Sequence, residues 1–187
     1  MKALGLVGTN GAGKSTLCSY LKEKGYDVFS LSDVLRDRLR KEGIALTRDS
    51  MTDEANKIKE TEGLSYLAEQ AYEMAVKRGS DLVVFDSVRN VDEVTLLKDK
   101  GVVFIGVNAP IDVRYQRILS RQRESDFVDF DTFKRQDNRE NTGESTGQNI
   151  QAALKECHSI VDNSGSYEKL VSDITIILQK DGFLCPD

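Results

Sequence analysis

Near its amino terminus the chain reads Gly8-Thr9-Asn10-Gly11-Ala12-Gly13-Lys14-Ser15. This stretch fits the pattern G-x-x-x-x-G-K-[ST], in which glycines let consecutive backbone N–H groups turn inward around phosphate groups. An apolar run at residues 3–7 precedes it, and a helical pattern at residues 15–21 follows it. A strand, a glycine-rich turn and a helix amino terminus are the context that such a motif requires. The stretch therefore predicts a phosphate-binding loop after a first strand.

The lysine and serine that end this loop indicate a bound nucleoside triphosphate with Mg²⁺. Lys14 is expected to reach the β and γ phosphates, and the Ser15 hydroxyl to coordinate a Mg²⁺ ion that bridges them. The predicted ATP-binding residues are the loop and the residue after it, namely Gly8, Thr9, Asn10, Gly11, Ala12, Gly13, Lys14, Ser15 and Thr16. The glycines are not spaced as G-x-G-x-x-G, so the loop disfavours a dinucleotide such as NAD.

A second acidic position follows a buried-strand pattern further along the chain. Residues 82–85 read Leu-Val-Val-Phe, and Asp86 comes directly after them. Such a strand delivers a carboxylate beside the Mg²⁺ shell in phosphate-loop proteins, so Asp86 is predicted to be a metal ligand. The alternative is that Asp86 only caps the following turn. Arg89 lies three residues past Asp86, where a guanidinium can bind an acceptor phosphate through two hydrogen bonds.

The acceptor side is predicted from a second strand, residues 27–31, and from the helix after it, for which Ser32 is the expected N-cap. Asp33 lies in the first helical turn, and the carboxyl ends of parallel strands meet at one edge of a sheet. We therefore expect Asp33 to act near the acceptor; an acid that only complements the helix dipole is the alternative. Arg36 and Arg40 share a helix face and are expected to bind an acceptor phosphate, or else to form a solvated stripe.

Strands and helices alternate along the chain, and this alternation predicts the fold class. Further apolar runs at residues 102–107 and 160–161 lack strict polar alternation, as is typical of parallel strands covered on both faces. Helical patterns separate these runs, which predicts a single α/β domain over residues 1–187 with a doubly wound parallel sheet of about five strands. Residues 33–79 are expected to form a helical acceptor-binding region.

Arginines recur at every third or fourth position through a predicted helix at residues 111–119 and just beyond it. The stripe consists of Arg114, Arg117 and Arg121. Arg117 and Arg121 are expected to close over the transferring phosphoryl group, where charge spreads over the equatorial oxygens. Basic residues that merely complement a helix carboxyl terminus are the alternative. The highly charged segment 121–147 is expected to be a mobile lid.

Composition narrows the choice of partners. The 187 residues carry a formal net charge of -5, with 39% hydrophobic and 30% charged residues. This acidic balance argues against broad binding to nucleic acid or to an anionic membrane, and no apolar stretch approaches the ~20 residues of a membrane span. We expect a cytoplasmic monomer or homodimer with a small-molecule nucleotide acceptor as its partner. The widely spaced cysteines and the single histidine, His158, do not suggest a metal site.

Several segments together resemble the P-loop kinases of small metabolites, and within them the dephospho-CoA kinase-like and adenylate kinase-related group. The resemblance covers nearly the whole chain and is carried by the loop at 8–15 and by Ser32-Asp33-Val34-Leu35-Arg36, Asp86-Ser87-Val88-Arg89 and Val161-Asp162-Asn163-Ser164-Gly165-Ser166. It implies a nucleoside monophosphate kinase-like fold, an acceptor role for Asp33, lid roles for Arg117 and Arg121, and contact of Asn163 with the nucleotide base. The chain departs from dephospho-CoA kinases in having one acid, not Asp-x-Asp, after its second strand.

The expected activity is ATP-dependent phosphoryl transfer to a (deoxy)nucleoside monophosphate. Arg36, Arg40 and Arg89 suit an acceptor phosphate, which is itself an anionic nucleophile and needs no general base. Dephospho-CoA kinase, in which Asp33 would serve as base for a hydroxyl, is the alternative enzyme. A nucleotide-binding regulatory ATPase is the alternative outside the kinases.

Overall fold

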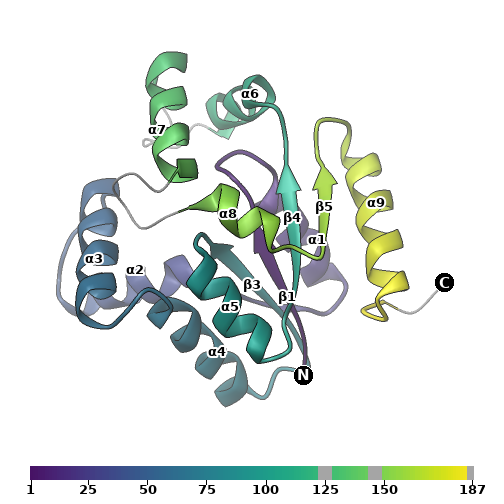
Figure 1. Cartoon of the computed structure of the whole chain (residues 1–187), viewed down its shortest axis with the longest axis horizontal. Coiled ribbons are helices and arrows are strands. Elements are labelled where there is room, and N and C mark those ends of the chain that lie inside the picture. Colours follow the sequence, from purple (N-terminus) through teal and green to yellow (C-terminus); the bar gives the residue numbers. More distant parts are fainter. Residues whose placement is uncertain (122–127, 143–148, 185–187) are drawn as a thin grey trace.

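The computed structural model describes residues 1–121, 128–142 and 149–184, with the backbone alone at positions 48 and 49. Its centre is a five-stranded sheet in the order β2-β3-β1-β4-β5, and every pairing is parallel (Figure 1). The strands are β1 (Lys2–Val7), β2 (Asp27–Ser30), β3 (Leu82–Val88), β4 (Val103–Asn108) and β5 (Ser159–Asp162). The predicted α/β fold with a parallel five-stranded sheet is therefore confirmed.

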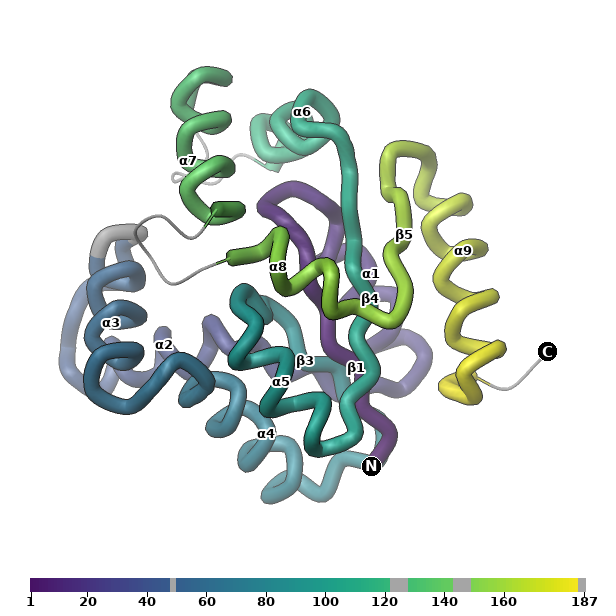
Figure 2. The backbone as a smooth tube through the Cα atoms, in the orientation of Figure 1, coloured from purple at the N-terminus to yellow at the C-terminus, as the bar shows by residue number. Residues whose placement is uncertain are grey.

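Helices supply a hydrophobic core on each face of the sheet. One core takes its helical side chains from α1 (Lys14–Glu23) and α9 (Tyr167–Lys180). The opposite core takes them from α2 (Leu31–Lys41), α3 (Arg48–Thr61), α4 (Tyr66–Arg78), α5 (Val91–Asp99) and α8 (Ile150–Lys155). Two further helices, α6 (Ile111–Arg121) and α7 (Phe130–Thr142), lie beyond the carboxyl ends of β1 and β4 (Figure 2).

The central strand shows how both faces are filled. Ala3 and Val7 of β1 belong to one core and Leu4 and Leu6 to the other, and all four side chains are 3% exposed or less. Successive side chains of a strand point to opposite faces, so an uninterrupted apolar run buries both. Burial of each large aliphatic side chain contributes about 1.5–3 kcal/mol. The strand that leads into the phosphate-binding loop is thus firmly fixed.

Two boundaries near the site differ from the predicted ones. Strand β2 ends at Ser30, which is also the N-cap of α2, so the prediction of Ser32 as N-cap was wrong. The helix begins earlier because Leu31, at 1% exposure, is buried in the core as its first residue. Strand β3 continues past the predicted end at residue 85 to Val88, so Asp86 lies within the strand.

The segment predicted as a mobile lid is partly helical. Its residues 122–127 and 143–147 lie outside the described residues, whereas Phe130–Thr142 form the regular helix α7. The short helix α8 after the segment was not predicted. Helix α8 has only six residues and buries Ile150, Ala153 and Leu154 in the core, so it depends on tertiary contacts.

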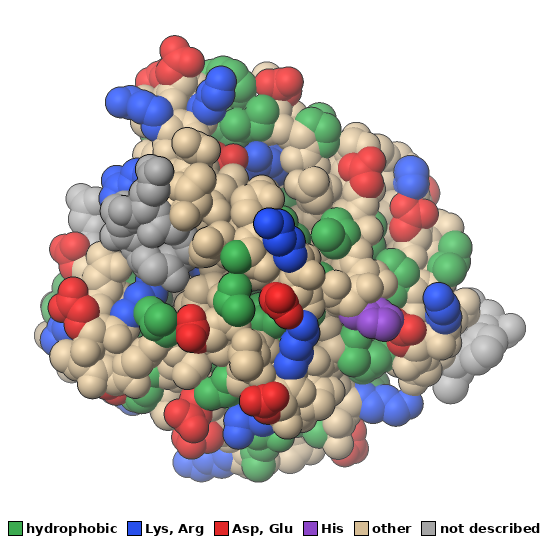
Figure 3. Space-filling model, in the orientation of Figure 1, with side chains coloured by type: hydrophobic (Ala, Val, Ile, Leu, Met, Phe, Trp, Pro, Cys, Tyr) green, Lys and Arg blue, Asp and Glu red, His purple; other side chains and the backbone are tan. Residues whose placement is uncertain are grey.

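The helices in the part of the chain that the structure describes can be compared with the length and hydropathy of a membrane span. No helix there is both long and apolar enough to cross a bilayer. On the face shown in Figure 3, basic and acidic side chains are interspersed, with hydrophobic side chains scattered between them.

Candidate active site

The phosphate-binding loop joins β1 to α1, and its glycines shape it. Gly11 (φ 79°) and Gly13 (φ 106°) adopt left-handed conformations that residues with a Cβ rarely take. A Cβ on Gly13 would lie 2.0 Å from the Asn163 amide nitrogen, which donates to the Ala12 carbonyl at 2.8 Å. Asn163 is buried and holds the loop from behind. The structure places the Asn163 amide against the loop backbone, and its contact with the nucleotide base, which the resemblance implied, stays a prediction.

Lys14 opens α1, and its ammonium folds back onto the loop. Nζ donates to the Gly8 carbonyl at 2.5 Å and to the Thr9 carbonyl at 3.1 Å. Burial lowers the pKa of Lys14 to about 8, and the charge of Asp86 opposes this shift. Phosphate oxygens in the loop would stabilise the charged form of the lysine. The structure thus holds Lys14 where the motif needs a cation.

Asp86 and Ser15 are the predicted Mg²⁺ ligands, and the surroundings of Asp86 fit a cation. Its Oδ1 is buried and has no hydrogen-bond partner within the described residues. Its Oδ2 accepts a hydrogen bond from Ser87 Oγ at 3.2 Å. A buried carboxylate oxygen without a donor is costly unless a cation or water satisfies it. Ser15 is exposed, and a hydroxyl with a carboxylate supplies the hard oxygen ligands that Mg²⁺ prefers.

The backbone directly after Asp86 is strained. Ser87 has φ 66°, the only positive φ at a non-glycine residue in the described ranges. The pairing of β1 with β3 shifts register here, since Gly5 lies opposite Phe85 but Val7 lies opposite Val88. Such an irregularity turns side chains near a strand end, and strained residues cluster at functional sites. The shift places Asp86 beside the loop and Ser87 in the wall of a pocket.

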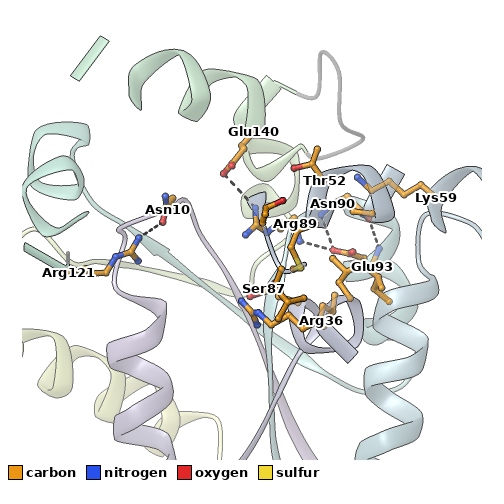
Figure 4. Close-up of a pocket in the computed structure, with 18 residues that line it drawn as sticks. Asn10, Arg36, Thr52, Lys59, Ser87, Arg89, Asn90, Glu93, Arg121 and Glu140 are labelled. Atoms are coloured by element: carbon orange, nitrogen blue, oxygen red, sulfur yellow. Dashed lines mark hydrogen bonds and ion pairs between the residues drawn. The ribbon is translucent and has the colours of Figure 1, made fainter. Parts of the chain in front are cut away.

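A pocket of about 370 Å³ lies next to the phosphate-binding loop. It is open to the loop through Asn10 and is bounded by α2, α3, the start of α5 and α7 (Figure 4). Part of its wall is apolar, made by Leu31, Leu35, Leu46, Met51, Ala55 and Leu67. The rest is mainly polar or charged and includes Arg36, Lys59, Arg89, Glu93, Arg121 and Glu140. The pocket therefore offers an apolar surface and a ring of charged groups to one ligand.

The predicted acceptor-side residues divide into two groups. Arg36 and Arg89 line the pocket. Asp33 does not; its side chain is 58% exposed and pairs with Arg36 at 2.6 Å, so it orients a guanidinium instead of facing the pocket. Arg40 also lies outside, 59% exposed and paired with Asp37 at 2.8 Å. One helical turn carries Arg40 about 6 Å further from the strand ends than Arg36, so sharing a face does not bring it to the pocket.

The three arginines of α6 have different surroundings. Arg121 Nη2 donates to Asn10 Oδ1 at 3.2 Å, which links the end of α6 to the loop (Figure 4). Arg117 Nη1 is buried and has no hydrogen-bond partner among the residues described. Arg114 is 5% exposed and donates to Asp137 of α7 through both terminal nitrogens, at 2.5 and 2.8 Å. Arg114 therefore serves structure by joining α6 to α7, while Arg121 contacts the loop through Asn10.

Glu93 and Glu140 line the pocket although the sequence did not suggest them. Glu93 Oε2 accepts hydrogen bonds from the backbone N–H groups of Arg89 at 2.7 Å and Asn90 at 3.3 Å. The bond from Asn90 is part of a capping box at the start of α5. Burial raises the pKa of Glu93 to about 7. The Asn-x-x-Glu spacing was a signal that could have placed Glu93 at a helix start. No local signal identified Glu140, because its position depends on how α7 packs.

Comparisons with known proteins identify the family and the fold. Residues 4–144 match the family model described as AAA domain. A UPF0200 protein of Sulfurisphaera tokodaii is 35% identical over 138 residues, which cover 73% of this chain and 76% of the relative. A UPF0200/UPF0201 protein of Archaeoglobus fulgidus is 32% identical over 187 residues, or 96% of this chain, and the chain spans 56% of that relative's length.

Solved structures show the same fold at low sequence identity. Shikimate kinase from Acinetobacter baumannii in complex with shikimate superposes with a TM-score of 0.58 at 16% identity, over 98% of this chain and 96% of that one. TT1252 from Thermus thermophilus superposes with a TM-score of 0.56 at 21% identity, over 96% of this chain and 97% of that one. The loop, the sheet order and these matches agree on a P-loop domain of the kind that binds nucleotides. The chain belongs to the AAA domain family AAA_18 and to the UPF0200 family of its archaeal relatives.

Proposed function

We propose that the protein transfers the γ-phosphoryl group of ATP to a small nucleotide-type acceptor, a (deoxy)nucleoside monophosphate. The observation that carries this proposal is the pocket beside the loop, which joins Arg36 and Arg89 to an apolar wall. Guanidinium groups bind phosphate with two hydrogen bonds, and an apolar wall suits a nucleobase. The resemblance to adenylate kinase-related proteins supports the same assignment.

Each group would have a distinct role in the transfer. The loop amides and Lys14 would hold the β and γ phosphates, and Arg117 and Arg121 would stabilise charge on the phosphoryl group in flight. Asp86 and Ser15 would hold Mg²⁺, which supplies charge neutralisation on the triphosphate when bound. Arg36 and Arg89 would orient the acceptor phosphate so that its oxygen approaches in line.

A phosphate acceptor fits the pocket better than a hydroxyl acceptor that relies on Asp33. Transfer to a hydroxyl benefits from a carboxylate base within hydrogen-bond reach. Asp33, the residue predicted for that role, is mostly exposed and bonded to Arg36. This position supports the monophosphate over the dephospho-CoA alternative, and it gives Arg36 an orienting partner.

A phosphotransfer screen tests the proposal. The full chain would be mixed with ATP and Mg²⁺ and offered ribo- and deoxynucleoside monophosphates and dephospho-CoA, with Lys14→Ala as the inactive control. Arg89→Ala should raise the acceptor KM by about 10-fold or more and change the ATP KM little, because a bidentate phosphate contact is lost. Asp33→Asn should lower kcat by less than about 10-fold.

The opposite pattern would reject the proposal. Phosphorylation of dephospho-CoA alone, with a loss in kcat of about 10² or more for Asp33→Asn, would identify a hydroxyl acceptor and a catalytic base. ATP hydrolysis without transfer to any acceptor would instead indicate a regulatory ATPase.

A further inference from the structure

The acceptor pocket contains a carboxylate whose place suggests a specific task. Glu140 of α7 lines the pocket, and its side chain is 18% exposed. Its Oε2 lies 3.7 Å from Arg89 Nη1, on the guanidinium that the proposed function gives to the acceptor phosphate (Figure 4). The negative charge of Glu140 also acts on Lys14: burial lowers the pKa of this lysine, and Glu140 partly opposes that shift. Glu140 therefore lies between the donor and acceptor sides of the site.

The helix that carries Glu140 is anchored by another carboxylate. Asp137 of α7 accepts hydrogen bonds from both terminal nitrogens of the buried Arg114. Arg114 Nη1 also donates to the Asn10 carbonyl of the loop at 3.2 Å. Asp137 and Glu140 are three residues apart and so lie on one face of the helix. One carboxylate fixes α7 to α6 and the loop, and the other extends to the acceptor pocket.

We propose that Glu140 is the counter-anion of the empty acceptor site: it pairs with Arg89 until the phosphate of the acceptor displaces it, and thereby sets acceptor affinity. This inference rests on the proposed function. Glu140 is a specificity-determining residue in this scheme, because only a ligand with an anionic group can replace it on Arg89. A neutral ligand would leave the pair intact.

The charges explain why both anions do not share the guanidinium. At a separation of about 4 Å, two unit charges in a partly buried site interact by several times the thermal energy. A phosphate oxygen on Arg89 would meet this repulsion from Glu140. The bidentate phosphate contact is the stronger of the two, so the phosphate stays and the Glu140 side chain rotates away from the guanidinium. Binding therefore includes the free energy of breaking the Arg89–Glu140 pair.

Calorimetry on the full chain tests this scheme with AMP, CMP, GMP, UMP and the four nucleosides as probes. Glu140→Gln should lower the dissociation constant of the preferred monophosphate about 10-fold and leave that of the matching nucleoside unchanged. Asp131→Asn is the control, because Asp131 is an exposed acid on the same helix and its loss removes the same charge from the protein. It should change neither constant.

A second measurement needs no acceptor. In the ligand-free protein, Arg89→Ala and Glu140→Gln should each speed hydrogen exchange in α7 by about threefold. The double variant should exchange no faster than either single variant, because both substitutions break the same ion pair. An unchanged exchange rate in Arg89→Ala would show that the pair is absent in solution and overturn the proposal.

The outcomes separate this inference from the proposed function. A wild-type protein that binds none of the monophosphates would overturn both. Monophosphate binding by the wild type with an unchanged or weaker constant in Glu140→Gln would overturn only the counter-anion role. A kcat loss of about 10² in Glu140→Gln would place the carboxylate on the reacting atoms and likewise overturn it.

Discussion

Replacement of Arg114 by methionine should destabilise the protein far more than replacement of an exposed arginine. Arg114 and Asp137 are 6% and 7% exposed at their side chains, and the guanidinium also donates from Nε to the Ala109 carbonyl at 3.0 Å. Removing the arginine would leave the Asp137 carboxylate buried without a cation, with only the hydrogen bond from the Asn141 amide at 3.1 Å, and such a loss typically costs about 3–5 kcal/mol. In a domain of this size the thermal unfolding midpoint falls by about 2–4 °C for each kcal/mol of stability lost, so Arg114→Met should lower it by roughly 10 °C.

The double variant Arg114→Met/Asp137→Leu distinguishes a buried-charge penalty from lost packing. Once both charges are gone, the desolvation cost disappears with them, and such exchanges are often neutral or stabilising. The double variant should therefore recover most of the lost stability. Arg40→Met is the matched control, because Arg40 is 59% exposed and its pair with Asp37 should contribute less than about 1 kcal/mol.

Thermal and urea unfolding, followed by circular dichroism, would measure these differences. A single variant Arg114→Met within about 1 kcal/mol of wild type would refute the reasoning, because it would mean that the pair is solvated in solution. A double variant as unstable as Arg114→Met would show that the loss does not come from a buried unpaired charge. Packing of the guanidinium over Phe133, 5.8 Å from the ring centroid, would then account for the loss.

Three further outcomes follow from the site. Lys14→Ala should keep its fold but lose about 10² to 10³ in kcat, measured by steady-state ATP turnover, and a value within about threefold of wild type would contradict its role. Asp86→Asn should shift the Mg²⁺ dependence of ATP binding to higher concentration, and an unchanged titration would reassign the ligand. The pKa of Glu93 is raised by burial from 4.5 to about 7, so the folded state binds the extra proton. The free energy of unfolding should fall as pH rises from about 4.5 to 7, by an amount on the order of 3 kcal/mol, and Glu93→Gln should flatten that slope in urea titrations at each pH.

The sheet and the loop could be predicted because their signals are local. The buried strands are continuous apolar runs, and the loop has a fixed spacing of glycine, lysine and serine. Strand positions at residues 3–7 and 102–107 accordingly agree with β1 and β4 to within one residue. Parallel order then followed from the alternation of strands with helices.

Arg36 and Arg89 were predicted and line the pocket, but the sequence could not separate them from acids and arginines that lie elsewhere, because that depends on tertiary packing. Helix α7 shows few apolar residues, and it is held by Phe133 against the Tyr115 ring at 5.5 Å and by the Asp137 pair to Arg114. Neither contact is visible in the sequence of α7 alone, so the helix within the predicted lid segment was not foreseen. Glu140 was missed for the same reason. Asp33 was assigned to the acceptor because the carboxyl ends of parallel strands meet at one edge, which does not fix the direction of a side chain in the helix that follows. Arg40 was assigned from helix periodicity, which fixes a face but not a distance from the strand ends.

The contact between Asn163 and the loop makes the motif dependent on residues far from it in the chain. Asn163 follows β5, about 150 positions after Gly13, yet its amide occupies the space next to that glycine and bonds to the Ala12 carbonyl. A shortened protein that ended at residue 144 would keep every letter of the motif and the whole region matched by the AAA domain model. It would also lose β5 and the amide that supports the loop, so trimming this protein to its recognisable part should damage the nucleotide site that the trimming was meant to preserve.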